Sequence, residues 1–146
     1  MAKATPAELS SPQLLSAIIT FFGLDIKQSI IKSMKQVNSI TVSELSQMAE
    51  KMYGNLVKAV VDIEKNLLVV DAEMHVDEEQ FLLENGSKQS YLWGINLYPG
   101  KFGQDDFVEF DSMVNIRPRQ NNMSRGVDDP DIRSLIIKIV TEIVTR

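Results

Sequence analysis

Two apolar runs in the middle of the chain, over residues 57–63 and 68–74, constrain the fold more than any other feature. If a two-residue turn is placed at Lys65-Asn66, four cross-strand pairs on one face are apolar: Ile63 with Leu68, Val61 with Val70, Ala59 with Ala72, and Val57 with Met74. On the opposite face the same register pairs Lys58 with Glu73. Because side chains alternate along a strand, one register explains both faces and predicts an antiparallel hairpin.

The C-terminal segment has the pattern of an amphipathic helix. Asp129 is a good N-cap, and Pro130 suits the first helical position. Apolar residues then recur at helical spacing: Ile132, Leu135, Ile136, Ile139, Val140 and Ile143. This stripe predicts a helix that packs on the core.

Weaker patterns complete the order of elements after residue 36. They predict a short strand over 36–40, a helix from the Thr41–Glu44 capping box to Gly54, a helix over 78–84 capped by Asp77, a strand over 91–98, a longer strand over 107–117 and a polar loop over 118–127. Together they predict an α+β fold, in which an antiparallel sheet of four to five strands carries helices on one face. The other face is expected to be polar.

The first 35 residues form a separate helical extension in this interpretation, ahead of an α+β domain over 36–146. Two apolar stripes are expected to lie on its helices: Leu14, Leu15, Ile18, Ile19 and Phe22, then Ile26, Ile30, Ile31 and Met34. A pair of short helices is marginal in water and needs a surface to cover it. We therefore expect a homodimer through residues 12–35, since symmetric packing avoids burying the charges of the polar sheet face.

Composition excludes several classes of protein. The 146 residues include no Cys and one His, so disulfides, thiolate metal sites and a multi-imidazole zinc site in a monomer are excluded. The net charge of −5 argues against binding to duplex nucleic acid over a broad face. The apolar run over 14–24 is too short for a membrane span and has no cleavage-site pattern, so a cytoplasmic protein is expected.

One candidate site combines carboxylates with the single imidazole. Asp71, Glu73 and His75 would share one face of a strand, and Asp111 would lie on the strand over 107–117. Such groups suit Mg²⁺ or Mn²⁺, or general acid-base chemistry. The alternative is a solvated face on which Lys58 pairs with Glu73.

A second candidate site is the polar segment around residues 115–125. Its side chains of interest are Asn115, Arg117, Arg119, Gln120, Asn122, Ser124 and Arg125. Guanidinium forks and amide donors bind phosphates and carboxylates well. The alternative is a rigid loop tied down by its own side chains, with the nearby Asp128, Asp129 and Asp131 pairing with the arginines.

A third feature is Trp93-Gly94 within the strand over 91–98. Trp93 is expected to pack in the core, and Gly94 to allow a backbone or ligand to approach closely.

Several long runs resemble an uncharacterised prokaryotic family, domain of unknown function five-six-seven-four. They are residues 61–65 (VDIEK), 71–79 (DAEMHVDEE), 86–89 (GSKQ), 92–99 (LWGINLYP), 110–120 (FDSMVNIRPRQ) and 124–125 (SR). The resemblance covers roughly residue 36 onward. It implies a compact intracellular domain and no particular activity.

Two functional hypotheses follow. The first is a ligand- or partner-binding module that recognises an anionic group through Arg117, Arg119 and Arg125. The alternative is a small metal-dependent phosphodiester hydrolase, in which Asp71, Glu73, His75 and Asp111 would hold the ion. A structural or interaction protein is a third class.

Overall fold

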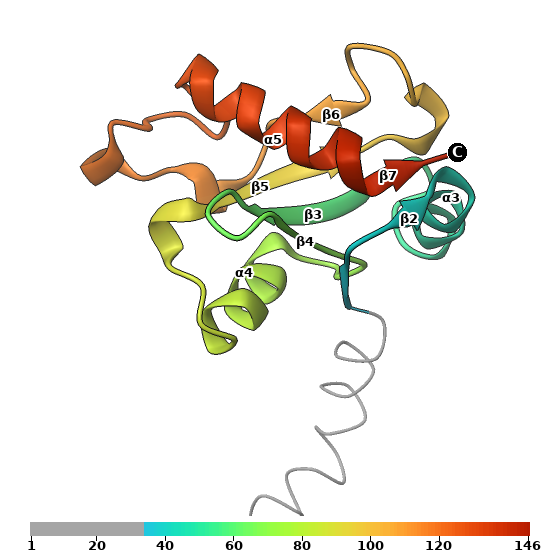
Figure 1. Cartoon of the computed structure of the whole chain (residues 1–146), viewed down its shortest axis with the longest axis horizontal. Helices are drawn as coiled ribbons and strands as arrows, with labels where there is room; N and C mark the ends of the chain where they lie inside the picture. The colour runs from blue at the N-terminus through green and yellow to red at the C-terminus, as the bar shows by residue number, and fades with distance from the viewer. Residues whose placement is uncertain (1–33) are drawn as a thin grey trace, which may run out of the picture. The chain divides into compact units, whose positions relative to one another are not determined.

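The computed structural model describes residues 34–146, so the predictions for the helices and dimer contact of the extension lie outside the described residues, apart from Met34 and Lys35. An antiparallel sheet of five strands, in the order β1-β4-β3-β5-β6, forms its centre (Figure 1). The strands are β1 (Lys35–Val37), β3 (Val57–Asp62), β4 (Leu67–Val70), β5 (Leu92–Leu97) and β6 (Val108–Glu109). The predicted α+β class is confirmed.

Within residues 34–146, three α-helices surround the sheet. They are α3 (Val42–Lys51), α4 (His75–Glu84) and α5 (Pro130–Ile143), and short 3₁₀ turns are η1 (Gln89–Tyr91), η2 (Pro99–Lys101), η3 (Met113–Asn115) and η4 (Pro118–Gln120). Two further strands, β2 (Ile40–Thr41) and β7 (Val144–Thr145), pair in parallel. This pairing ties the C-terminus to the segment that leads into α3, and β2 and β7 lie side by side in Figure 1.

Local capping explains where α3 and α5 begin. At α3 the Thr41 hydroxyl accepts from the Glu44 amide at 3.1 Å, and the Glu44 carboxylate accepts from the Thr41 amide at 3.0 Å. At α5 the Asp129 side chain accepts from the Asp131 amide, and Pro130 occupies the first turn. Both predicted helices are confirmed, because their start signals are local in sequence.

The main apolar core lies between α3, α5 and one face of the sheet. Buried side chains that meet there include Leu45, Ala59, Val61, Leu68, Val70, Trp93, Ile95, Leu97, Ile136, Ile139 and Val140. Leu135, expected in the same stripe, is 45% exposed because it lies at the flank of the buried side of α5. The expected core role of Trp93 is confirmed.

The second face of the sheet is not free. Leu82 of α4 packs there with Val60, Val69 and Leu92 in a smaller apolar cluster. In Figure 1, α4 and α5 lie on opposite sides of the sheet. The expectation of helices on one face only is therefore corrected, because β4 is apolar on both faces and, together with Val60 of β3, needs cover on the second face as well.

The hairpin of β3 and β4 forms, but its register differs from the predicted one by two residues. Val61 pairs with Leu68, not Val70, and Ala59 pairs with Val70. The Asp62 carboxylate accepts from the amides of Glu64 and Lys65 at 2.9 and 3.0 Å, which stabilises a four-residue turn instead of a two-residue one. A shift of two keeps each side chain on its predicted face, so the face was right and the partners were wrong.

Three other boundaries also differ from prediction. The strand expected over 107–117 is limited to β6, and the chain then enters η3. Helix α4 begins at His75 with Met74 as N-cap, so Asp77 is not the cap. The short strand expected over 36–40 divides into parts of β1 and β2, which belong to different sheets.

Candidate functional site

Asp71, Glu73 and His75 do not share a strand face, because β4 ends at Val70. Asp71 follows with a left-handed φ of 72°, and Glu73 is exposed in the turn, where its carbonyl accepts from the Tyr53 hydroxyl. His75 is the first residue of α4 and is buried. Burial raises the pKa of Asp71, and Lys35 and Lys51 partly offset this.

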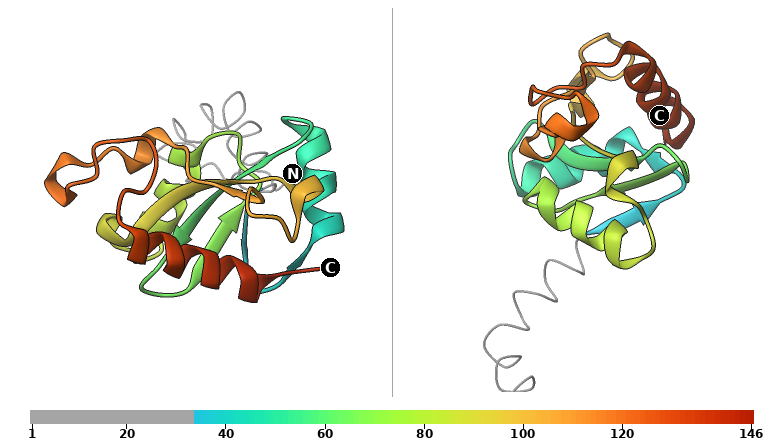
Figure 2. Two further views of the ribbon diagram at one scale, coloured as in Figure 1. Left: turned by 90° about the horizontal axis from the view of Figure 1, so that it is seen from above. Right: turned by 90° about the vertical axis from the view of Figure 1, so that its left-hand side faces the viewer.

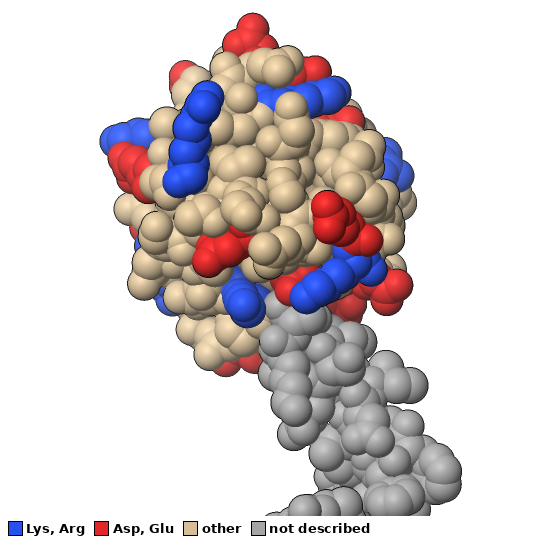
Figure 3. Space-filling model, turned by 90° about the vertical axis from the view of Figure 1, so that its right-hand side faces the viewer, with Lys and Arg blue, Asp and Glu red and all other residues tan. Residues whose placement is uncertain are grey.

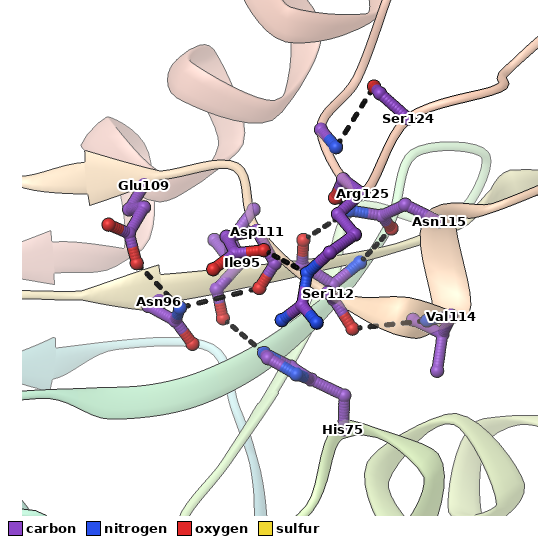
Figure 4. A network of polar contacts seen from close by, with 12 residues as sticks. His75, Ile95, Asn96, Glu109, Asp111, Ser112, Val114, Asn115, Ser124 and Arg125 are labelled. Carbon is purple, nitrogen blue, oxygen red and sulfur yellow. Dashed lines mark hydrogen bonds and ion pairs between the residues drawn. The ribbon is translucent and has the colours of Figure 1, made fainter.

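The hydrolase hypothesis required these carboxylates to converge with Asp111. Among residues 34–146, no group of three or more His, Asp or Glu side chains is placed to hold a metal ion. The part of the first candidate site that does come together is His75 with Asp111, near the Asn96 side chain of β5 (Figure 4).

His75 is held against the middle of β5. Its Nε2 lies 2.7 Å from the Ile95 carbonyl oxygen, and since a carbonyl only accepts, Nε2 carries the proton in this contact. Burial lowers the pKa of His75. The Ile95 contact, Asp111 and Asn96 work in the opposite direction, and Lys58 lowers the pKa further. A neutral ring therefore donates through Nε2 and leaves Nδ1 as an acceptor.

Asn96 occupies the centre of a small polar network beside His75. Its Nδ2 donates to Glu109 Oε1 at 2.8 Å and to the Asp111 carbonyl at 3.3 Å. The Tyr98 hydroxyl donates to the same Glu109 oxygen at 3.0 Å, and burial together with this contact raises the pKa of Tyr98. Asn96 Oδ1 is buried and has no hydrogen-bond donor within the described part of the chain.

Gly94 is where the polar segment locks onto the sheet. The Asn115 side chain accepts from the Gly94 amide at 2.8 Å and donates to the Gly94 carbonyl at 2.9 Å. A Cβ on residue 94 would lie 2.6 Å from Ser112 Cβ, so only glycine leaves room for this contact. The predicted close approach at Gly94 is confirmed, and the approaching group is the chain itself.

A second amide, Asn122, holds the loop from inside. Its Nδ2 donates to the carbonyls of Asn115 at 2.7 Å and Gly126 at 2.8 Å, and its Oδ1 accepts from the Asp128 amide at 2.8 Å. Asp128 also accepts from the Ser124 hydroxyl and the Met123 amide, and these hydrogen bonds lower its pKa. Asn122 and Ser124 are thus internal supports of the loop.

Arg117 also supports the loop. It donates to the carbonyls of Gln89 and Leu92, and its guanidinium lies 4.0 Å from the centroid of the Trp93 ring. Burial lowers the pKa of Arg117, and Glu79 partly offsets this. Gln120 continues the attachment by donating to the Ser90 carbonyl at 3.0 Å. These contacts pin the loop to the start of β5.

Two arginines of the candidate set are displayed to solvent. Arg119 is exposed in η4, and Arg125 is exposed with its Nε 2.5 Å from Asp111 Oδ1. An ion pair between two side chains that are about half exposed contributes little to stability. The seven loop residues therefore separate into five that hold the loop and two that point outward.

Sequence reasoning did not predict that the carboxylates of α4 are buried. Glu78 is fully buried, accepts from the Ala72 amide at 3.3 Å, and has a pKa raised well above its ordinary value by burial. Glu79 is also buried, which raises its pKa, although Arg117 lowers it. The helical spacing of the sequence could have indicated this burial, because residues 75, 78, 79 and 82 share one side of a helix and Leu82 is apolar. Asn96 was missed because the apolar residues around it marked the strand as core.

The main cavities lie elsewhere in the described structure. A cavity of about 770 Å³ lies between α5 and residues 102–110, with Phe102, Phe107 and Ile137 among its lining residues. A second, of about 440 Å³, lies between α3 and η2. Neither is lined by a residue of the two predicted sites. The face shown in Figure 3 carries interspersed acidic and basic side chains instead of a field of one sign.

Fold and site together define a small α+β domain with a polar loop that is held by its own hydrogen bonds and packs against β5 of the sheet. The chain belongs to the family described as "Protein of unknown function (DUF5674)", whose sequence model matches residues 23–143. The match starts before residue 36, where the resemblance was expected to begin. No curated protein and no solved structure was found to match. Within residues 34–146, none of the helices has the length and apolar character to cross a membrane.

Proposed function

We propose that this protein is a binding module that recognises an anionic group of its ligand or partner through Arg119 and Arg125. The supporting observation is that the side chains of the loop divide into an inward-facing set and a solvent-facing set. Asn115 and Asn122 make their hydrogen bonds inward, whereas the two arginines face solvent. Arg117, which the sequence grouped with them, belongs to the support.

A rigid support matters for recognition of this kind. A long cationic side chain on a mobile loop loses conformational entropy when it binds, and a preformed loop reduces that loss. The ion pair between Arg125 and Asp111 is exposed and therefore easily exchanged for a contact with a ligand anion.

A titration with a short peptide that carries two glutamate residues, followed by amide chemical shifts, tests the proposal. We expect the largest shifts within residues 117–125 and weaker binding at higher salt, because exposed charges are screened. Charge reversal at both positions (Arg119→Glu, Arg125→Glu) should weaken binding at least about tenfold, which corresponds to about 1.4 kcal/mol.

The control is Lys138→Glu, which reverses an exposed charge on α5. It should leave the titration unchanged. Shifts spread evenly over the surface, or equal binding by the double variant and the wild type, would show that the loop is not the recognition site.

A further inference from the structure

The same loop displays its large apolar side chains to solvent. Met113 is 64% exposed, Met123 69% and Ile116 38%. Meanwhile Ser112, Asn115 and Asn122, which are polar, are buried. The usual distribution of polar and apolar side chains is thus reversed within one segment.

Only the buried polar half of this reversal serves folding. The buried amides are needed to satisfy backbone groups of a segment whose only helical elements are the short 3₁₀ turns η3 and η4. Met113 and Met123 leave about two thirds of their surface exposed, so hydrophobic stabilisation of the fold does not explain them. Exposed apolar side chains gathered on one surface are typical of sites for association with another molecule, and methionine adapts well to such contacts.

Backbone pairing brings the apolar and cationic groups onto one small surface. The amide of Arg117 donates to the Asn122 carbonyl at 2.8 Å, and the Asn122 amide donates to the Arg117 carbonyl at 3.1 Å. Ile116 and Met123 are the next positions outward from this antiparallel bridge and therefore neighbours. Arg119 lies in the turn that the bridge closes, and Arg125 is two residues beyond Met123. Figure 2 shows this segment projecting past the end of the sheet, away from the C-terminus.

We propose that the occupant of this surface is a protein segment in which one or two acidic side chains are flanked by apolar ones. This inference rests on the proposed function and names its partner. Arginine and methionine are both enriched at the centres of protein interfaces. The arginines would bind the carboxylates, and Met113, Ile116 and Met123 would pack against the flanking apolar side chains.

Charge favours such a segment over a nucleic acid or an anionic membrane. Four carboxylates border the loop: Asp111, Asp128, Asp129 and Asp131. The whole chain also carries a net charge of −5. An extended polyanion would meet these acids as well as the arginines, whereas a short segment with few carboxylates need not.

Fluorescence anisotropy with three labelled twelve-residue peptides tests the inference on the full chain. One peptide combines Glu with Leu, one Glu with Ser, and one Lys with Leu. We expect the Glu-Leu peptide to bind at least about tenfold more tightly than the Glu-Ser peptide, and the Lys-Leu peptide to bind weakest. The double variant Met113→Ser, Met123→Ser should bind the Glu-Leu peptide no better than wild type binds the Glu-Ser peptide. The control Met74→Ser changes a methionine that is 55% exposed elsewhere, and it should bind like the wild type.

The outcomes separate the two proposals. If Arg119→Ser with Arg125→Ser weakens peptide binding while the methionine variant does not, the inference is wrong and the proposed function stands. If the arginine variant binds all peptides like the wild type, the proposed function itself fails. If the protein binds phosphatidylserine vesicles more tightly than the Glu-Leu peptide, and the methionine variant loses this binding, the occupant is a membrane and the inference is wrong. If the methionine variant has a lower solution mass than the wild type, the occupant is a second copy of the chain and the inference is again wrong.

Discussion

The two faces of the central sheet are both covered by helices, but the side chains buried on them differ in polarity. The face under α3 and α5 is closed by apolar side chains such as Val61, Trp93 and Ile136. The face under α4 has a small apolar cluster, and beside it lie buried polar residues: His75, Glu78, Glu79, Asn96 and Asn115.

Because of this difference, one face contributes mainly to the stability of the domain and the other mainly determines where the polar loop attaches. Apolar contacts are roughly proportional to buried area and tolerate changes of partner, so the α5 face supplies stability. Buried hydrogen bonds require particular donors at particular positions, and a missing partner is costly. The α4 face therefore fixes where the polar loop attaches, and substitutions on the two faces should have different consequences.

The largest expected effect is on the α5 face. Ile136→Asp places a charge without a partner in the apolar core, because Ile136 is fully buried. We expect the free energy of unfolding to fall by more than about 3 kcal/mol. Urea denaturation measures this change. Leu135→Asp, one residue earlier and 45% exposed, should cost less than about 1 kcal/mol. Equal effects at the two positions would contradict the assigned faces of α5.

On the α4 face, Gly94→Ala should destabilise by about 2 kcal/mol, because the new Cβ overlaps Ser112 and Val114. The loop must move to relieve the overlap, so trypsin should cleave after Arg119 and Arg125 faster than in the wild type. Gly100→Ala is the matched control, since a Cβ there meets nothing within 4 Å. Unchanged cleavage in Gly94→Ala would show that the loop does not depend on this contact.

A smaller effect, with the opposite sign, is expected at Glu78. Burial holds its pKa in the folded state well above the ordinary value of 4.5, so the folded protein keeps a proton that the unfolded chain releases as pH rises. The stability of the wild type therefore declines as pH rises above about 4.5. Glu78→Gln resembles the protonated form and should be more stable than wild type at pH 7, because it removes the free-energy cost of ionising a buried carboxyl group.

Denaturation curves at several pH values test this prediction. The advantage of Glu78→Gln should vanish near pH 4. Glu50→Gln, exposed on α3, should show little effect at either pH. A constant advantage at every pH would mean that the ionisation of Glu78 is not its cause.

The smallest effect on the stability of the α+β domain is expected from substitutions within residues 1–33. The homodimer through residues 12–35 stays a prediction from the apolar pattern, and Ile18→Glu with Phe22→Glu interrupts that pattern in the full chain. Light scattering should then give half the mass of the wild type, whereas Gln13→Glu, outside the stripe, should leave the mass unchanged. A wild type that is already monomeric at micromolar concentration would rule out the dimer.

Much of the fold could be predicted because its signals are local. Thr41 with Glu44 marks the start of α3, Asp129 with Pro130 marks the start of α5, and the pattern over 57–74 marks a hairpin. The candidate site was predicted only in part. Its residue types were recognised, yet whether Arg117 or Arg119 faces solvent depends on carbonyl groups of η1 and β5, far away in the sequence.

By itself, the sequence determined the class of fold, the helices α3 and α5, and the face on which each residue of β3 and β4 lies. Period and capping are enough for these features, since they involve neighbouring residues. Tertiary structure decided the register of the hairpin, the second covered face, the burial of His75 beside Asn96, and the division of the polar loop into support and exposed surface. Each of these depends on which distant groups satisfy a buried hydrogen bond or cover an apolar side chain, and no local pattern records that choice.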